Sequence, residues 1–288
     1  MAQGGGIARL LKTLRTDDWL TPAIDRYYNR SRPERWVHAD PTIHPSTLGS
    51  PCALDLEFSL LGHRTPADGQ GARRMDNGTD VGKRWARALK DMGILISAEE
   101  PAHNDDPLIA GSIDVIVQHR ETGKKSIGEI KSMHSFGFKG LPTPVSDRMA
   151  NMRALSMRYK NYCLQLTTYM TIHGLDAWFL FENKDNQEYR VFWVTPTPEM
   201  IAEVFTDGPP KSAQQAFYEG VLLPPPYKRT SKTCQDCYRK KTCFRFQDGD
   251  VELWKKVQQQ FKQAGVVMKE PVGWPAAAPL RLDEDPAL

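Results

Sequence analysis

The sequences LIAGSIDVIV at residues 108–117 and SIGEIKS at residues 126–132 decide the fold that we expect. Both segments are rich in β-branched residues, and the polar turn RETGK at 120–124 lies between them. This pattern predicts two antiparallel strands joined as a hairpin. Because side chains alternate between the faces of a strand, Glu129 and Lys131 should project on one side and Ile130 on the other.

The acidic and basic residues of this hairpin are the first candidates for chemistry. An acid and an amine in an otherwise apolar strand cost free energy of burial unless they are paired or bind a ligand. If Asp114 of the first strand lies opposite Glu129 and Lys131, two carboxylates and one ammonium group converge. Such a set can hold a divalent metal ion and a water molecule beside a phosphodiester.

The size and composition of the chain fit a globular protein. It has 288 residues, of which 40% are apolar and 25% are charged, and its net charge is +3. This length can bury the core of one domain, or of one domain with an appendage. Because the net charge is small, nucleic-acid binding would depend on local basic patches.

Cellular context follows from what the sequence lacks. The first residues, MAQGGG, do not have the layout of a secretory signal, and no apolar run approaches the length of a membrane helix. We therefore expect a cytoplasmic protein without a membrane partner. Thiols stay reduced in that compartment, so clustered cysteines indicate a metal site rather than disulfides.

Hydrophobic periodicity places further elements around the hairpin. Their sum predicts an α/β protein with a mixed central sheet flanked by helices. We expect an edge strand and loop at 94–106, which includes Glu99 and Glu100, strands at 177–182 and 189–194, helices at 7–20, 147–173 and 197–218 (broken near 208–210), a loop from residue 73 leading into a helix that ends near 92, and a loop at 136–144.

We divide the chain into four regions. A helical and basic segment covers 1–43, the core covers 44–226, a cysteine-containing segment covers 227–246, and a C-terminal helix with a loose tail covers 247–288. The tail is rich in Pro and Ala and ends in acidic residues, a composition that rarely forms a packed core.

Three of the five cysteines form the pattern C-x2-C-x5-C at Cys234, Cys237 and Cys243. A tetrahedral metal site or a cubane cluster needs a fourth ligand. Cys163 falls in an apolar stretch of the long helix, where a core thiol is expected, so Cys52 at a helix entrance is the better fourth ligand. Spacing alone leaves both zinc and an iron–sulfur cluster open.

Basic residues gather in two places that could guide a nucleic-acid strand, although a solvated charged face is the simpler interpretation. One group lies on the long helix and the other beside the cysteines. The candidate DNA-binding residues are Arg148, Arg153, Arg158, Lys160, Arg239, Lys240 and Lys241.

Taken in order, these residues resemble those of the RecB-like nucleases of the PD-(D/E)XK superfamily, in particular their iron–sulfur branch. That branch includes CRISPR-associated iron–sulfur exonucleases, AddB-type nuclease domains and phage relatives. The resemblance covers roughly residues 44–246. It depends on Asp114, the sequence Glu129-Ile130-Lys131, the sequence QLTTY at 165–169, and one cysteine before and three after this core.

The resemblance implies a role for each of these residues. Asp114, Glu129 and the backbone carbonyl of Ile130 would bind Mg²⁺ or Mn²⁺, and Lys131 would orient or deprotonate the attacking water. Gln165 and Tyr169 are four residues apart, so they share one helix face and can both point at the site. The four cysteines would hold a [4Fe–4S] cluster, with structural Zn²⁺ as the alternative.

The function implied is that of a metal-dependent deoxyribonuclease. We expect an exonuclease that acts on single-stranded DNA or duplex ends, in a prokaryotic or phage-infected cell. Recombination or repair proteins are the expected partners, and an oligomer is compatible with this function.

One departure from the family pattern favours a second hypothesis. Relatives carry a metal-binding His where this chain has Gly82. Asp80 could replace it only if the chain is irregular there, and His103 could approach from the loop before the first hairpin strand. The alternative function is therefore a catalytically weakened DNA-binding or assembly subunit that keeps the nuclease fold.

Overall fold

A computed structural model describes residues 20–31, 34–65, 69–269 and 274. The helix predicted at 7–20 lies outside these residues except for Leu20, as does most of the predicted C-terminal tail. None of the described helices combines the length and apolar character needed to cross a lipid bilayer.

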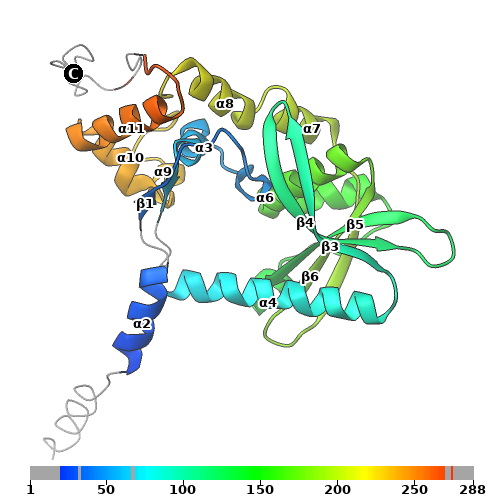
Figure 1. Ribbon diagram of the computed structural model, residues 1–288. Coiled ribbons are helices and arrows are strands. Elements are labelled where there is room, and N and C mark those ends of the chain that lie inside the picture. The colour runs from blue at the N-terminus through cyan, green and yellow to red at the C-terminus, as the bar shows by residue number, and fades with distance from the viewer. Residues whose placement is uncertain (1–19, 32–33, 66–68, 270–273, 275–288) are drawn as a thin grey trace, which may run out of the picture.

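A five-stranded mixed sheet forms one side of the molecule, on the right in Figure 1. Its strand order is β3-β4-β5-β6-β7; β5 and β6 are parallel and the other neighbours are antiparallel. The predicted hairpin is confirmed as β4 and β5, and the predicted edge strand as β3. The strands are β3 Leu95–Asp105, β4 Leu108–Gln118, β5 Lys125–Met133, β6 Asp176–Asn183 and β7 Tyr189–Val194.

Helix α6, Arg148–His173, joins the two parallel strands and confirms the predicted long helix. The Asp147 carboxylate caps its first turn, and Gly174 ends it with a left-handed φ of 63°. At Tyr159 the backbone leaves helical geometry, with φ −127° and ψ 42°. The half before this kink carries exposed Arg153 and Arg158 but buries Met152 and Leu155, and in the half after it residues 163–170 are buried.

The opposite face of the sheet is covered by α4, Gly69–Asp91. Val81 and Leu89 of α4 pack with Ile130 of β5 and with Trp178 of β6. The loop predicted from residue 73 is wrong, because α4 is helical from Gly69 onward. Helix α2, Leu20–Ser31, packs along this part of α4, and such tertiary packing outweighs the low helix propensity of its Asn and Gly residues.

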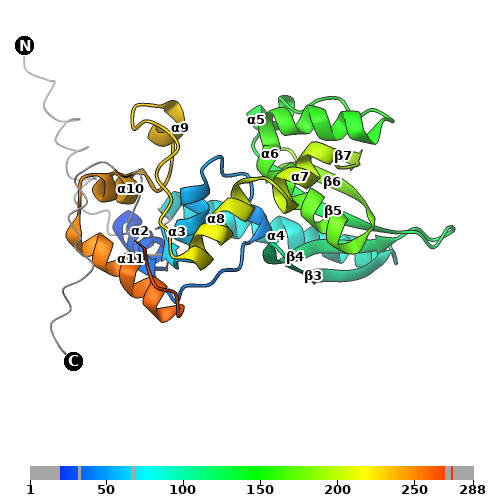
Figure 2. The same ribbon diagram turned by 90° about the horizontal axis from the view of Figure 1, so that it is seen from above.

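The other helices lie beside the sheet and largely form a second group, the helical lobe (Figure 2). Its core helices are α3 Ala53–Leu60, α8 Pro209–Glu219, α10 Lys240–Gln247 and α11 Val251–Gln263. One continuous apolar core joins them to the sheet. The remaining elements are β1 Arg35–Trp36, η1 Pro45–Thr47, β2 His63–Arg64, α5 Ser135–Lys139, α7 Pro198–Phe205 and α9 Lys232–Gln235.

Two predictions at the ends of the sheet have different outcomes. The broken helix predicted at 197–218 is confirmed as α7 and α8, which are separated near Gly208. The loop predicted at 136–144 is wrong in its first part, because Ser135–Lys139 forms the short helix α5. The side chain of His134 caps α5 by accepting the backbone N–H of Gly137, which supports this turn locally.

Two glycines of the sheet layers should respond in opposite ways to alanine. A Cβ at Gly82 in α4 would have no heavy atom of the described residues within 4 Å, so Gly82→Ala should stabilise the fold by about 0.5–1 kcal/mol. A Cβ at Gly128 in β5 would overlap the Trp178 ring and lie 2.7 Å from Val115 Cγ2. Gly128→Ala should therefore destabilise it by about 1–3 kcal/mol. Urea unfolding measures both changes, and equal effects would contradict this packing.

Candidate functional site

The predicted hairpin residues meet where β4 and β5 separate. The two strands pair from Gln118–Lys125 to Val115–Gly128, and the pairing ends there. In the next position, Asp114 Oδ2 accepts a hydrogen bond from the backbone N–H of Ile130 at 2.7 Å. The carboxylate therefore replaces a backbone partner and lies between the two strands.

Glu129 and Lys131 project on the same side of β5, as their spacing predicts. Lys131 Nζ lies 2.5 Å from Glu129 Oε1, whereas Ile130 packs against α4 on the other face. Glu129 is fully buried, and neither of its oxygens accepts a well-aligned hydrogen bond from the residues that the structure describes. The ion pair with Lys131 is thus the main compensation for burying this carboxylate.

Helix α6 contributes the two residues predicted from the helix face. Lys131 Nζ donates a hydrogen bond to Gln165 Oε1 at 3.2 Å, and Gln165 is also hydrogen-bonded to the Tyr169 side chain. The same ammonium group lies 4.8 Å from the centre of the Tyr162 ring, a cation–π contact. The structure therefore brings together all five side chains predicted for catalysis: Asp114, Glu129, Lys131, Gln165 and Tyr169.

Burial dominates the electrostatics of this cluster. It raises the pKa of Glu129 to about 7, and it also raises the pKa of Asp114. Burial opposes the charged form of Lys131, but the carboxylates of Glu129 and Asp114 outweigh it and raise the pKa of this amine. The charged form of a buried carboxylate that receives no hydrogen bonds is poorly stabilised, and a bound cation would stabilise it.

The donor set therefore fits a hard divalent cation such as Mg²⁺ or Mn²⁺, which binds oxygen ligands. As the side chains stand, no three His, Cys, Asp or Glu groups within the described residues are arranged to hold a metal ion. The fit depends on the chemistry of the donors, above all on Glu129 Oε2, which has no partner among the described residues.

One acid of this neighbourhood, Glu99 of β3, belongs to none of the sequence motifs. The pairs Ala98–Val115 and Glu100–Ile113 place it opposite Asp114. Its carboxylate accepts a hydrogen bond from Ser112 Oγ at 3.1 Å. Cross-strand counting could have found Glu99, but only with the register of the β3–β4 pair, which the sequence does not reveal.

Neither Asp80 nor His103, the two possible replacements for the family's metal-binding His, lies in the cluster around Glu129. Helix α4 is regular through Asp80, whose side chain is exposed. His103 is 58% exposed and contacts Asp105, so it is occupied at another position of β3. Gly82 has open space in the direction of a side chain, and nothing among the described residues fills it.

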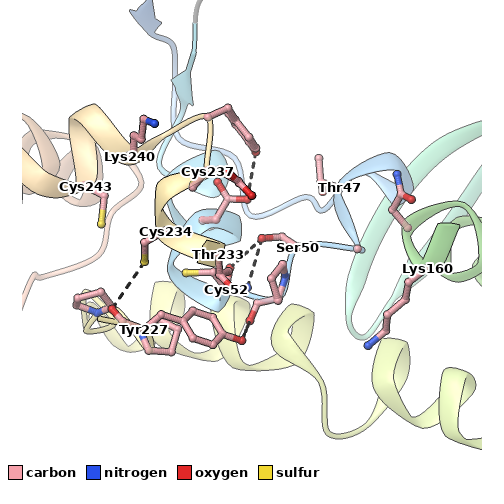
Figure 3. A pocket seen from close by; sticks show the side chains of 18 of the residues that line it. Thr47, Ser50, Cys52, Lys160, Tyr227, Thr233, Cys234, Cys237, Lys240 and Cys243 are labelled. Atoms are coloured by element: carbon pink, nitrogen blue, oxygen red, sulfur yellow. Dashed lines mark hydrogen bonds between the residues drawn. The ribbon is translucent and has the colours of Figure 1, made fainter. Parts of the chain in front are cut away.

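The four cysteines predicted as ligands line one cavity of about 540 Å³ between α3 and the C-terminal segment (Figure 3). Each is half-buried and none forms a disulfide, whereas Cys163 is fully buried in the core, as predicted. Cys52 occupies the N-cap position of α3, the predicted helix entrance, and the other three thiols come from α9, the turn after it, and α10.

Burial raises the pKa of Cys52 to about 12 and also raises the pKa of Cys237 and Cys243. These thiols are therefore protonated at neutral pH unless a metal binds and displaces the protons. Four thiols around one cavity fit either a zinc ion or an iron–sulfur cluster, and the donor set does not separate the two.

The predicted DNA-binding residues fall into different environments. Arg158, Lys160 and Lys240 line the cysteine cavity, although Lys160 also pairs with Glu203 at 2.7 Å. Arg148 is paired with Asp176 at 2.9 Å. Arg153 and Lys241 are exposed to solvent.

Arg239 is the clear exception, and the prediction that it contacts DNA is wrong. Its side chain is only 5% exposed and pairs with Asp55 of α3 at 2.6 Å. It also donates hydrogen bonds to Ser59 Oγ and to the His63 carbonyl, at 2.6 and 2.9 Å. This guanidinium joins the cysteine-containing segment to α3, because the buried Asp55 carboxylate needs a cationic partner.

Comparison with known proteins adds little. No family model and no curated protein matches the sequence. A solved structure described as the crystal structure of SSO0001 is similar at 15% sequence identity with a TM-score of 0.41, and the match covers 78% of this chain and 96% of that one. A similarity at this level carries no functional argument.

The buried role of Arg239 can be tested by its effect on stability. Arg239→Ala leaves Asp55 buried without its cationic partner and should lower the free energy of unfolding by about 3–5 kcal/mol. The exposed neighbour Lys241 is the matched control, and Lys241→Ala should change it by about 0.5 kcal/mol or less. Urea unfolding measures both. If Arg239→Ala is instead as stable as the wild type and binds DNA more weakly, Arg239 acts as a DNA-binding residue and not as a buried partner of Asp55.

Proposed function

We propose that this protein is a metal-dependent deoxyribonuclease with a PD-(D/E)XK core, in which Asp114, Glu129 and Lys131 form the catalytic centre. One observation carries the proposal. The fully buried Glu129 has an oxygen that finds no partner in the described part of the chain, and it lies beside the Lys131 ammonium group and the Asp114 carboxylate. A purely structural ion pair would not need the second acid at this position.

The residues divide the work of phosphodiester hydrolysis as follows. Asp114, Glu129 and the carbonyl of Ile130 would hold Mg²⁺ or Mn²⁺. When bound, the ion supplies Lewis-acid stabilisation and lowers the pKa of the attacking water. Because the neighbouring carboxylates raise its pKa, Lys131 stays an ammonium group that orients this water rather than taking its proton, and its positive charge stabilises the negative charge that develops on the phosphoryl oxygens.

The α6 residues position the amine. Gln165 accepts a hydrogen bond from Lys131, and Tyr169 in turn holds Gln165. Gly111 leaves room for this phenol, since a Cβ there would lie 3.0 Å from the Tyr169 hydroxyl. These contacts fix the orientation of the Lys131 ammonium group toward the substrate. Less conformational entropy then has to be lost on reaching the transition state.

The substrate that we propose is DNA, as single strands or duplex ends cut by an exonuclease. Support comes from the basic side chains Arg158, Lys160 and Lys240 around the cysteine cavity and from exposed Arg153 and Lys241. Such groups bind phosphates without regard to sequence. We further propose a cytoplasmic role beside recombination or repair proteins.

A [4Fe–4S] cluster bound by Cys52, Cys234, Cys237 and Cys243 completes the proposal. The four thiols lie on segments that are 182 residues apart at their closest in sequence, yet they line the same cavity. A cluster there would join α3 to the C-terminal segment and add its binding free energy to folding. Structural zinc is the alternative occupant.

The second candidate function is a DNA-binding or assembly subunit with little turnover. The observation that favours it is the open space at Gly82, where relatives would carry a metal ligand. The two functions differ in one property, namely cleavage of DNA that is already bound.

Cleavage can be measured with purified protein, Mn²⁺ and end-labelled single-stranded DNA. We expect metal-dependent cleavage by the wild type and a loss of about 100-fold or more in Lys131→Ala, which removes the positioned amine. The matched control is Lys125→Ala on the exposed end of the same strand, which should cleave normally. Retention of DNA without cleavage would support the second function, and equal rates for both variants would contradict the catalytic role of Lys131.

The occupant of the cysteine cavity can be identified by elemental analysis and visible absorption after anaerobic purification. We expect iron and sulfide, a brown colour, and loss of both elements in Cys234→Ser. Cys163→Ala, which alters a core thiol outside the cavity, should keep the cluster. Zinc without iron would exclude the iron–sulfur assignment.

A further inference from the structure

Three acids, Glu99, Asp114 and Glu129, lie at one level on the adjacent strands β3, β4 and β5. This level is where β4 and β5 separate, a place called the fork below. Glu99 of β3 lies opposite Asp114 of β4, between the pairs Ala98–Val115 and Glu100–Ile113. Asp114 in turn reaches the amide of Ile130, next to Glu129 of β5. A row of carboxylates thus crosses from the sheet edge to its buried interior.

The side chain of Glu99 is directed toward this row and not away from it. Its Oε2 accepts a hydrogen bond from Ser112 Oγ at 3.1 Å, and Ser112 lies two residues before Asp114 on the same strand. Residues two apart project from the same side of a strand. Glu99 itself has φ 53°, a left-handed conformation that non-glycine residues seldom adopt within a strand.

The charges around the fork do not balance. Three carboxylates face a single ammonium group, Lys131, and this amine is already engaged with Glu129 and Gln165. Glu129 Oε2, fully buried and without a partner among the described residues, indicates that a cation is needed there.

We infer that Glu99 is the third carboxylate of the cation site, reaching the metal ion from the edge strand. This inference rests on the proposed metal-dependent function. Glu99 is exposed and held by one hydroxyl, so its carboxylate can turn toward the ion without breaking the core. Mg²⁺ and Mn²⁺ favour six oxygen ligands, so Asp114, Glu129 and the Ile130 carbonyl leave positions that a further carboxylate or water can fill.

Direct measurement of Mn²⁺ binding by isothermal titration calorimetry tests this inference without relying on cleavage. Glu99→Gln keeps the size of the side chain and its capacity to accept from Ser112, but removes the charge. We expect at least about tenfold weaker Mn²⁺ binding in Glu99→Gln, and partial recovery in Glu99→Asp. Glu100→Gln is the matched control from the next position of β3 and should bind within about twofold of the wild type.

The outcomes separate this inference from the proposed function. Wild-type Mn²⁺ affinity in Glu99→Gln overturns the inference even if the protein cleaves DNA. Weaker binding in Glu99→Gln supports it, and if the wild type binds Mn²⁺ without cleaving DNA, only the proposed nuclease activity fails. A wild type that binds no Mn²⁺ contradicts both. Circular-dichroism melting of each variant confirms that it is folded.

Discussion

The hydrogen bond from the Ile130 amide to Asp114 is the interaction on which the candidate site depends. Where β4 and β5 part, the Ile130 N–H would lose a strand partner, and a buried N–H without an acceptor is costly. The Asp114 carboxylate satisfies this group at 2.7 Å. The same contact holds a negative charge beside Glu129 and Lys131, so one side chain both ends the strand pairing and builds the site.

A second buried interaction organises the helical lobe. Arg239 lies between Cys237 and Cys243 in sequence, and its partner Asp55 follows Cys52 by three residues. Their ion pair therefore brings the two cysteine-bearing segments together through protein groups alone. The thiols meet around a cavity that is already formed, which lowers the entropic cost of binding a metal or cluster there.

Much of the site was visible in the sequence because strand alternation is strict. The spacing of Glu129 and Lys131 predicts that they share a face, and their ion pair confirms it. Arg239 and Glu99 show where such reasoning stops. A basic residue in a basic stretch indicates a surface, and only the packing of α3 shows that Arg239 is buried. Glu99 looks like an ordinary edge-strand acid until the β3–β4 register places it opposite Asp114.

The sequence by itself determined the hairpin, the long helix, the direction of Glu129 and Lys131, and the distinction between Cys163 and the other four cysteines. These features follow from local periodicity and residue type, which act within a few residues of one another. Tertiary structure alone decided the helical start of α4, the burial of Arg239 and the nearness of Glu99 to Asp114. Each of these three features depends on contacts between segments that are distant in sequence. A local sequence pattern does not contain the free energy of such contacts.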